Sequence, residues 1–178
     1  MNLANKISVA RILMVPFFVA AILYYTPEND FFRFIALGIF VLAVFSDGLD
    51  GYIARRRGQK TVLGTYLDPI ADKLLLITAF ICLSTVNNFP EKFRIPAGVV
   101  LVVLSRDVII VVGALIIYVI TSKLEISPSK LGKITTFFQM MTIISVLLHF
   151  RFAFVVWNSA VLFTIFSGID YIWRGSRQ

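Results

Sequence analysis

Six long runs of apolar residues, each close to the length of a membrane span, follow one another along the chain. A helix that crosses a bilayer needs about 20 mostly apolar residues. In lipid, a helix satisfies every backbone polar group within its own segment. The pattern therefore predicts an all-α integral membrane protein with six transmembrane helices in one bundle, and one domain over residues 1–178. The predicted spans are Ile7–Tyr25, Phe31–Ala54, Gly64–Val86, Ile95–Thr121, Ile134–Phe150 and Phe152–Ile172.

Short polar breaks separate these runs. The segments 26–30, 56–59, 87–90 and 127–129 contain the Pro, Gly, Asn, Asp and Ser residues that are typical of turns. The fifth break, around His149 to Phe152, is the shortest and the hardest to place. We found no internal repeat and no low-complexity linker, so a single bundle is the simplest organisation.

Composition excludes the soluble and the disordered classes of protein. Of 178 residues, 58% are hydrophobic and 15% are charged, and the mean hydropathy is +0.87. Ordinary soluble domains have about 25% charged residues, and a disordered chain has far fewer apolar ones. A single cysteine, Cys82, excludes an internal disulfide framework and a cysteine-based metal cluster.

The net charge of +7 indicates a membrane surface as the partner of the basic residues, because Lys and Arg gather on one side of the predicted spans. If the N-terminus lies in the cytoplasm, only Arg33, Lys92, Arg94 and Arg151 fall in outer segments. The bias of Lys and Arg toward inner segments sets orientation, so both termini are predicted to be cytoplasmic. A nucleic-acid partner is unnecessary, and we expect none. The inner segments hold Lys6, Arg11, Arg55, Arg56, Arg57, Lys60, Lys123, Lys130, Lys133, Arg174 and Arg177.

Four carboxylates crowd into the stretch from Asp47 to Asp72. On a helix, Asp47 and Asp50 share one face, and so do Asp68 and Asp72. Consecutive spans with a short connection are usually antiparallel neighbours, which would bring both pairs together near the inner membrane surface. Carboxylates without nearby His or Cys favour a hard divalent cation, Mg²⁺ or Mn²⁺. Four carboxylates fit two ions better than one, although ordinary interfacial charges and a cation pathway are alternative interpretations.

Small residues and one arginine lie among the acids. Gly51, Ala54 and Gly64 let another backbone or a flat ligand approach the helix surface closely. The guanidinium of Arg55 suits a phosphate. These residue types favour a nucleotide or phosphate ligand beside the carboxylates.

The same residues resemble the signature of the CDP-alcohol phosphotransferase family. Asp47, Asp50, Gly51, Ala54, Arg55, Gly64, Asp68 and Asp72 match its defining positions and gaps. The continuation through Lys73, the opening segment 2–11 and the segment 132–140 are similar to the bacterial branch of the family that makes phosphatidylglycerophosphate, although that branch usually has Pro where Ala4 stands. The resemblance spans nearly the whole chain. It implies a membrane-embedded, metal-dependent phosphatidyltransferase, and it also suggests a homodimer.

The resemblance implies roles for individual residues. Asp47, Asp50, Asp68 and Asp72 would hold two Mg²⁺ or Mn²⁺ ions, and Asp72 would also accept the proton of the acceptor hydroxyl. Asp50 and its neighbours would seat the CDP-lipid, CDP-diacylglycerol, with Gly51, Ala54 and Gly64 contributing shape and Arg55 contributing charge. The acceptor would be glycerol 3-phosphate, and CMP would be released at the cytoplasmic face of the cell membrane.

An acceptor phosphate needs cations of its own. Arg106 is the leading candidate, because an arginine in the middle of a span is costly unless it has a partner or a function. Lys130 and Lys133 are next, at the inner start of the fifth span. An internal ion pair of Arg106 and the general inward bias of lysines are the structural alternatives.

Three other functions compete with this interpretation. Ser105-Arg106-Asp107 departs from the pattern of the branch, which often has Glu in place of Asp107, and is more like the related cardiolipin synthases, which use phosphatidylglycerol as acceptor. A small cation channel or transporter could use the acidic cluster as its ion site, but the acids crowd toward one face and paired repeats are missing. A structural scaffold would tolerate Asp47→Asn with unchanged lipid output.

Overall fold

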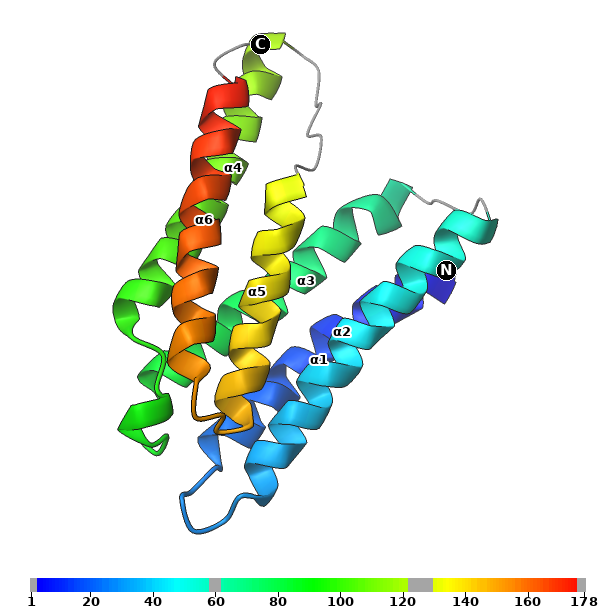
Figure 1. Ribbon diagram of the computed structural model, residues 1–178. Helices are drawn as coiled ribbons and strands as arrows, with labels where there is room; N and C mark the ends of the chain where they lie inside the picture. The colour runs from blue at the N-terminus through cyan, green and yellow to red at the C-terminus, as the bar shows by residue number, and fades with distance from the viewer. Residues whose placement is uncertain (1–2, 58–61, 122–129, 176–178) are drawn as a thin grey trace. The chain divides into compact units, whose positions relative to one another are not determined.

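A computed structural model describes residues 3–57, 62–121 and 130–175, and this part of the chain contains helices and no strand (Figure 1). The short 3₁₀ helix η1 spans Glu91–Phe93. The long helices are α1 (Leu3–Leu23), α2 (Phe31–Arg57), α3 (Val62–Thr85), α4 (Ala97–Thr121), α5 (Lys130–Leu147) and α6 (Ala153–Gly175).

Each of the six apolar runs forms one helix, so the all-helical prediction is confirmed for the described residues. The ends differ by a few residues. For example, α1 begins at Leu3 and not at Ile7, and α5 begins at Lys130 and not at Ile134. Lysines and other polar residues are compatible with a helix that extends beyond its apolar run, because they can reach water from a terminal turn.

The short fifth break is a helix C-cap. The structure ends α5 at Leu147 and places His149 in the left-handed region, with φ of 51°. The backbone N–H of Phe150 donates to the carbonyl of Ser145 over 2.9 Å. This is the hydrogen bond of a Schellman motif, and it allows α6 to begin six residues after α5 ends.

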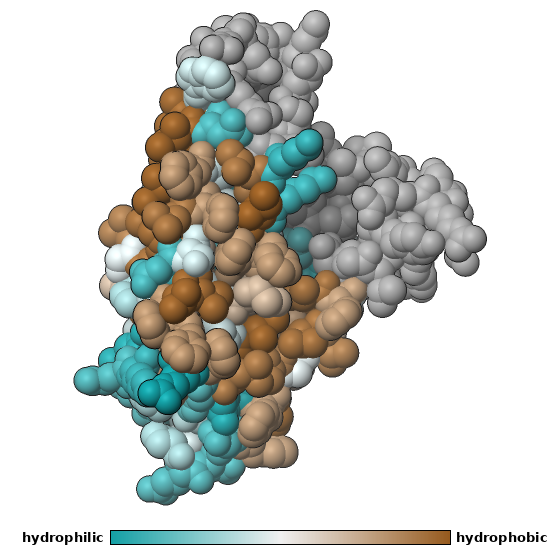
Figure 2. Space-filling view, viewed as in Figure 1, coloured by the Kyte–Doolittle hydropathy of each residue, from teal (hydrophilic) through white to brown (hydrophobic). Residues whose placement is uncertain are grey.

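Large apolar side chains cover much of the described surface (Figure 2). Phe17, Phe45 and Leu101 are each about two-thirds exposed. Two stretches, Glu91–Gly113 and Ala153–Trp173, are long and apolar enough to cross a membrane, and shorter apolar helical stretches cover Ser8–Leu23 and Phe31–Ser46. A surface of this kind is consistent with a membrane protein, since a soluble monomer rarely exposes large apolar patches.

The chain divides into two compact units, and the first contains α1, α2, α3, η1 and residues 146–148. Within it, α1 contacts both α2 and α3. The buried side chains of α3 include Ala71, Leu75, Ala79 and Leu83 at four-residue spacing, which is the stripe expected of a helix that packs along one face. Small alanines in this stripe let neighbouring helices approach closely.

Hydrogen bonds from Arg33 hold two chain segments of the first unit together. Arg33 is buried and donates from Nη1 to the carbonyl of Leu147 at 2.7 Å, and from Nε to Asp30 at 2.8 Å. Its cation thereby caps the last carbonyl of α5.

The second unit contains α4, most of α5, and α6. Helices α4 and α6 pack against each other, and the hydroxyl of Tyr171 on α6 donates to the carbonyl of Ile110 on α4 at 3.1 Å. Helices α5 and α6 are also in contact, because Phe138 of α5 stacks on Phe163 of α6 with ring centroids 4.6 Å apart. The hydroxyl of Thr135 adds a 2.9 Å hydrogen bond to the carbonyl of Phe163.

Gly113 is the residue that permits the close contact between α4 and α6. A Cβ at this position would lie 2.9 Å from Cε1 of the Tyr171 ring, closer than van der Waals contact allows. We expect Gly113→Ala to lower the thermal midpoint in detergent by several degrees, since overpacking costs about 1–3 kcal/mol. Gly98→Ala on the same helix meets no atom within 4 Å and should leave the midpoint unchanged or slightly raised. Equal midpoints for the two variants would contradict this packing.

Candidate active site

The acidic cluster predicted from the sequence falls on two neighbouring helices of the first unit. Positions 47 and 50 lie in α2, positions 68 and 72 lie in α3, and α2 contacts α3. Continuous helix through both segments agrees with the three- and four-residue spacing on which the prediction rests. Of the four carboxylates, only that of Asp72 belongs to the described side chains. The side chains of Asp47, Asp50, Asp68, Arg55 and Ala54, and the surroundings of Gly51 and Gly64, lie outside that description.

Asp72 forms an ion pair with Arg11 of α1. Nη1 of Arg11 donates to Oδ1 of Asp72 over 2.8 Å. The two partners differ in exposure, because the Arg11 side chain is 1% exposed and that of Asp72 is 28% exposed. A buried cation therefore holds a carboxylate that is still open to its surroundings.

The chemistry of Asp72 fits a divalent cation. A carboxylate offers about four lone-pair positions, and Nη1 of Arg11 donates to Oδ1. Oxygen donors of this kind are those that Mg²⁺ and Mn²⁺ prefer. Among the described side chains there is no group of three or more His, Cys, Asp or Glu residues that could hold a metal ion. The other three predicted ligands lie outside the described side chains.

Sequence reasoning missed the role of Arg11. The pattern of charges groups it with the inner basic residues, although it is the fifth residue of the first predicted span. An ionisable side chain within an apolar helix generally has a partner inside the protein, and this was the available signal. The identity of the partner depends on the packing of α1 against α3, which the sequence pattern does not contain.

Arg106, the candidate for binding the acceptor phosphate, lies in α4 and has two protein partners. Its Nη1 donates to Oδ1 of the adjacent Asp107 at 2.8 Å, and its Nη2 donates to the hydroxyl of Ser167 on α6, also at 2.8 Å. The side chains of Arg106 and Asp107 are both largely buried. The Nε of Arg106 is buried as well and has no hydrogen-bond partner among the described residues.

The other two candidate cations lie in the first turn of α5. Lys130 and Lys133 are both exposed, as expected for lysines near a membrane surface. They belong to the same unit as Arg106.

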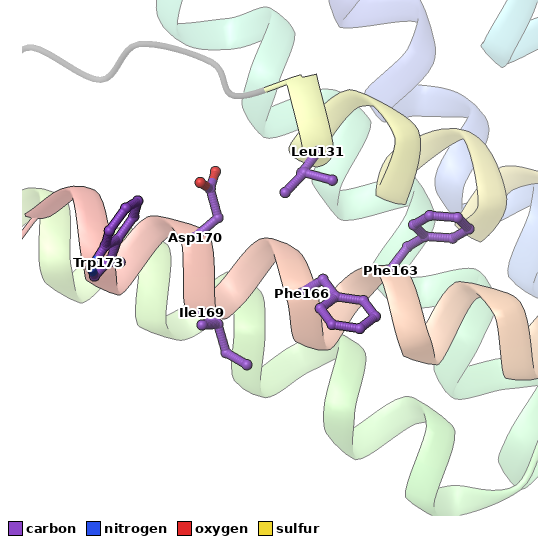
Figure 3. Close-up of a pocket in the computed structure, with 6 residues that line it drawn as sticks. All are labelled: Leu131, Phe163, Phe166, Ile169, Asp170 and Trp173. Atoms are coloured by element: carbon purple, nitrogen blue, oxygen red, sulfur yellow. The ribbon is translucent and has the colours of Figure 1, made fainter.

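The second unit also has an open hollow of about 520 Å³ between α5 and α6 (Figure 3). Its lining is apolar except for Asp170, which projects from α6 on the side of Leu131. None of the predicted site residues lines it. The lining consists of Leu131, Phe163, Phe166, Ile169, Asp170 and Trp173.

Comparison with known proteins places the chain in an enzyme family. The family model described as CDP-alcohol phosphatidyltransferase matches residues 1–166. The chain belongs to this family, which is an enzyme family, and the resemblance read from its eight-residue signature is confirmed.

Curated relatives cover most of the chain. A protein of Mycobacterium tuberculosis (strain H37Rv) named probable phosphatidylglycerophosphate synthase is 33% identical, over 99% of this chain and 83% of its own length. Two proteins named CDP-diacylglycerol–glycerol-3-phosphate 3-phosphatidyltransferase are each 34% identical. That of Bacillus subtilis aligns with 96% of this chain and 93% of its own length, and that of Aquifex aeolicus with 82% and 75%.

Proposed function

We propose that this chain transfers the phosphatidyl group from CDP-diacylglycerol to glycerol 3-phosphate, forming phosphatidylglycerophosphate and releasing CMP. The observation that carries the proposal is the eight-position signature from Asp47 to Asp72, within a chain whose relatives bear the name of this activity. The α2 and α3 placement of the four Asp positions and the partly exposed carboxylate of Asp72 support it.

Two Mg²⁺ or Mn²⁺ ions, held by Asp47, Asp50, Asp68 and Asp72, would supply charge neutralisation for the pyrophosphate and for the departing CMP. A hydroxyl oxygen of the acceptor attacks the phosphorus that carries diacylglycerol, and the bond from this phosphorus to the oxygen shared with CMP breaks. Asp72 takes the hydroxyl proton, which leaves the phosphodiester product and CMP. A carboxylate can serve as this base when its geometry places it beside the hydroxyl.

The residues around the acids would hold the CDP-lipid. Gly51, Ala54 and Gly64 would leave room for the cytidine, because none of them carries a side chain larger than a methyl group. Arg55 would bind the diphosphate through its guanidinium. Asp50 would lie between this pocket and the ions.

Arg106, Lys130 and Lys133 would bind the phosphate of the acceptor. The buried Nε of Arg106, which has no described hydrogen-bond partner, supports this assignment. An unsatisfied buried donor costs about 1–3 kcal/mol, and a phosphate oxygen would satisfy it. Asp107 and Ser167 hold the other two nitrogens and orient the guanidinium.

In this proposal the six helices all cross the cell membrane, with both termini and the active site in the cytoplasm. The lipid bilayer contacts the exposed apolar side chains, and a second copy of the chain completes a homodimer. The inward bias of Lys and Arg supports the orientation. A cysteine introduced at Glu28 should react with a membrane-impermeant thiol reagent that is added to intact cells. Reaction only after the cells are permeabilised would contradict the orientation.

The experiment that tests the function is CMP release by purified protein in detergent. With CDP-diacylglycerol, glycerol 3-phosphate and Mg²⁺ or Mn²⁺, we expect CMP and phosphatidylglycerophosphate in equal amounts. Excess EDTA should reduce the rate by at least a hundredfold, and added metal should restore it. Absence of CMP with every component present would contradict the proposal.

A second acceptor is favoured by one observation, the sequence Ser105-Arg106-Asp107, which is more like that of the related cardiolipin synthases. In that case phosphatidylglycerol would be the acceptor and cardiolipin the product. Mass spectrometry of the lipids formed with both acceptors present distinguishes the two reactions, and cardiolipin as the main product would replace the leading proposal.

A further inference from the structure

The two partners of the ion pair between Arg11 and Asp72 differ in exposure. Arg11 is buried to 1% exposure within α1, while Asp72 on α3 is 28% exposed. The guanidinium remains protonated under all ordinary conditions and carries its donors in a rigid fork. It can therefore fix the direction of a carboxylate more firmly than a flexible, hydrated cation can.

The helices that carry the pair are well packed. In α1, Phe18, Ala21 and Ile22 are almost completely buried, and in α3 the residue before Asp72, Ala71, is fully buried. Ser8 lies one turn before Arg11 on the same side of α1 and is also fully buried. Rigid elements of this kind position a functional side chain more accurately than a loop does.

We propose that Arg11 is a positioning residue for Asp72, holding Oδ1 so that the carboxylate keeps one orientation toward the acceptor hydroxyl. The inference rests on the proposed function, in which Asp72 binds metal and accepts the proton. In this proposal Arg11 is not itself a ligand of the ions or of the substrate. It acts through the 2.8 Å bond to Asp72.

Positioning and simple structural support predict different changes in metal binding. Removing a cation beside a metal ligand reduces the repulsion felt by an incoming divalent ion, so Mn²⁺ binding should tighten when Arg11 is neutralised. Turnover should fall at the same time, because the carboxylate is then free to change its orientation. Damage to the fold would weaken both binding and turnover.

The test compares Arg11→Gln and Arg11→Lys with the wild-type protein. Mn²⁺ affinity is measured by electron paramagnetic resonance without substrate, and kcat is measured by CMP release. For Arg11→Gln we expect Mn²⁺ to bind at least about threefold more tightly and kcat to fall at least about tenfold. Arg11→Lys keeps the charge but loses the fork. Its Mn²⁺ affinity should stay within about twofold of wild type, and its kcat should fall at least about threefold.

Arg33→Gln is the matched control, because Arg33 is also buried in the first unit and also pairs with an aspartate at 2.8 Å. It should lower the thermal midpoint while leaving Mn²⁺ affinity and kcat within twofold of wild type. If Arg11→Gln does not fold, Arg11→Lys decides the question by the same two measurements.

Three results would overturn the inference: a kcat of the Arg11 variants equal to wild type, Mn²⁺ binding by those variants that weakens in parallel with kcat, or a wild-type protein that binds no Mn²⁺. If the wild-type protein binds Mn²⁺ but releases no CMP, the proposed function fails. The Mn²⁺ titration of Arg11→Gln then still decides whether Arg11 controls the site.

Discussion

Asp72→Asn should lower kcat for CMP release by at least about a hundredfold. The amide that replaces the carboxylate cannot accept the acceptor proton, and it is a poor ligand for a hard divalent cation. General-base contributions alone are typically about 10²–10⁴-fold. Steady-state assays of CMP release with saturating CDP-diacylglycerol and glycerol 3-phosphate measure the change.

The same substitution has a second, separable effect on stability. It removes the carboxylate that pairs with the buried Arg11, and breaking a buried ion pair costs about 3 kcal/mol or more. Assays should therefore be run well below the thermal midpoint of the variant. Asp170→Asn makes the same substitution on α6 and serves as the control. Its kcat should stay within about twofold of wild type. Retention of more than half of wild-type kcat by Asp72→Asn would remove Asp72 from the catalytic role.

Arg106→Lys should raise the KM for glycerol 3-phosphate by at least about tenfold, with the KM for CDP-diacylglycerol unchanged. Lysine keeps a positive charge beside the buried Asp107, so the fold is preserved, but it loses the Nε–H donor proposed to bind the phosphate and the planar group that Asp107 and Ser167 orient. One charge-assisted hydrogen bond contributes about 1.5–3 kcal/mol, which corresponds to a tenfold change or more. Initial rates over a range of both substrates give the two KM values.

Arg94→Lys is the matched control for this change. Arg94 donates to the carbonyls of Asn87 and Phe89 in the first unit and has no proposed role in the site. Its KM for glycerol 3-phosphate should equal that of wild type. An unchanged KM for Arg106→Lys, together with a lower thermal midpoint, would reduce Arg106 to a structural partner of Asp107 and Ser167.

The helices could be predicted from the sequence because the signal for each is local. Each apolar run is long enough to be read without knowledge of its neighbours. The ends were less accurate, since polar residues such as Lys130 can occupy a terminal turn without ending the helix. The turn at His149 was hard to place for a different reason. Left-handed caps usually contain Gly or Asn, and the sequence here offers neither.

The site could be predicted only in part. Helical spacing is enough to group Asp68 with Asp72, because both lie on one segment. The pair of Arg11 and Asp72, 61 residues apart, depends on how α1 packs on α3. The hydrogen bond from Arg106 to Ser167 could not be predicted either, because Ser167 is also 61 residues away and on a different helix. Contacts of this kind follow from tertiary packing and leave no periodic signal.

The central claim is that carboxylates of α2 and α3 together bind divalent ions. Its most direct test is a crystal of the protein soaked with Mn²⁺. Two anomalous peaks among the side chains of Asp47, Asp50, Asp68 and Asp72 would agree with it. Carboxylates of α2 that lie far from those of α3, with no peak shared between them, would contradict it.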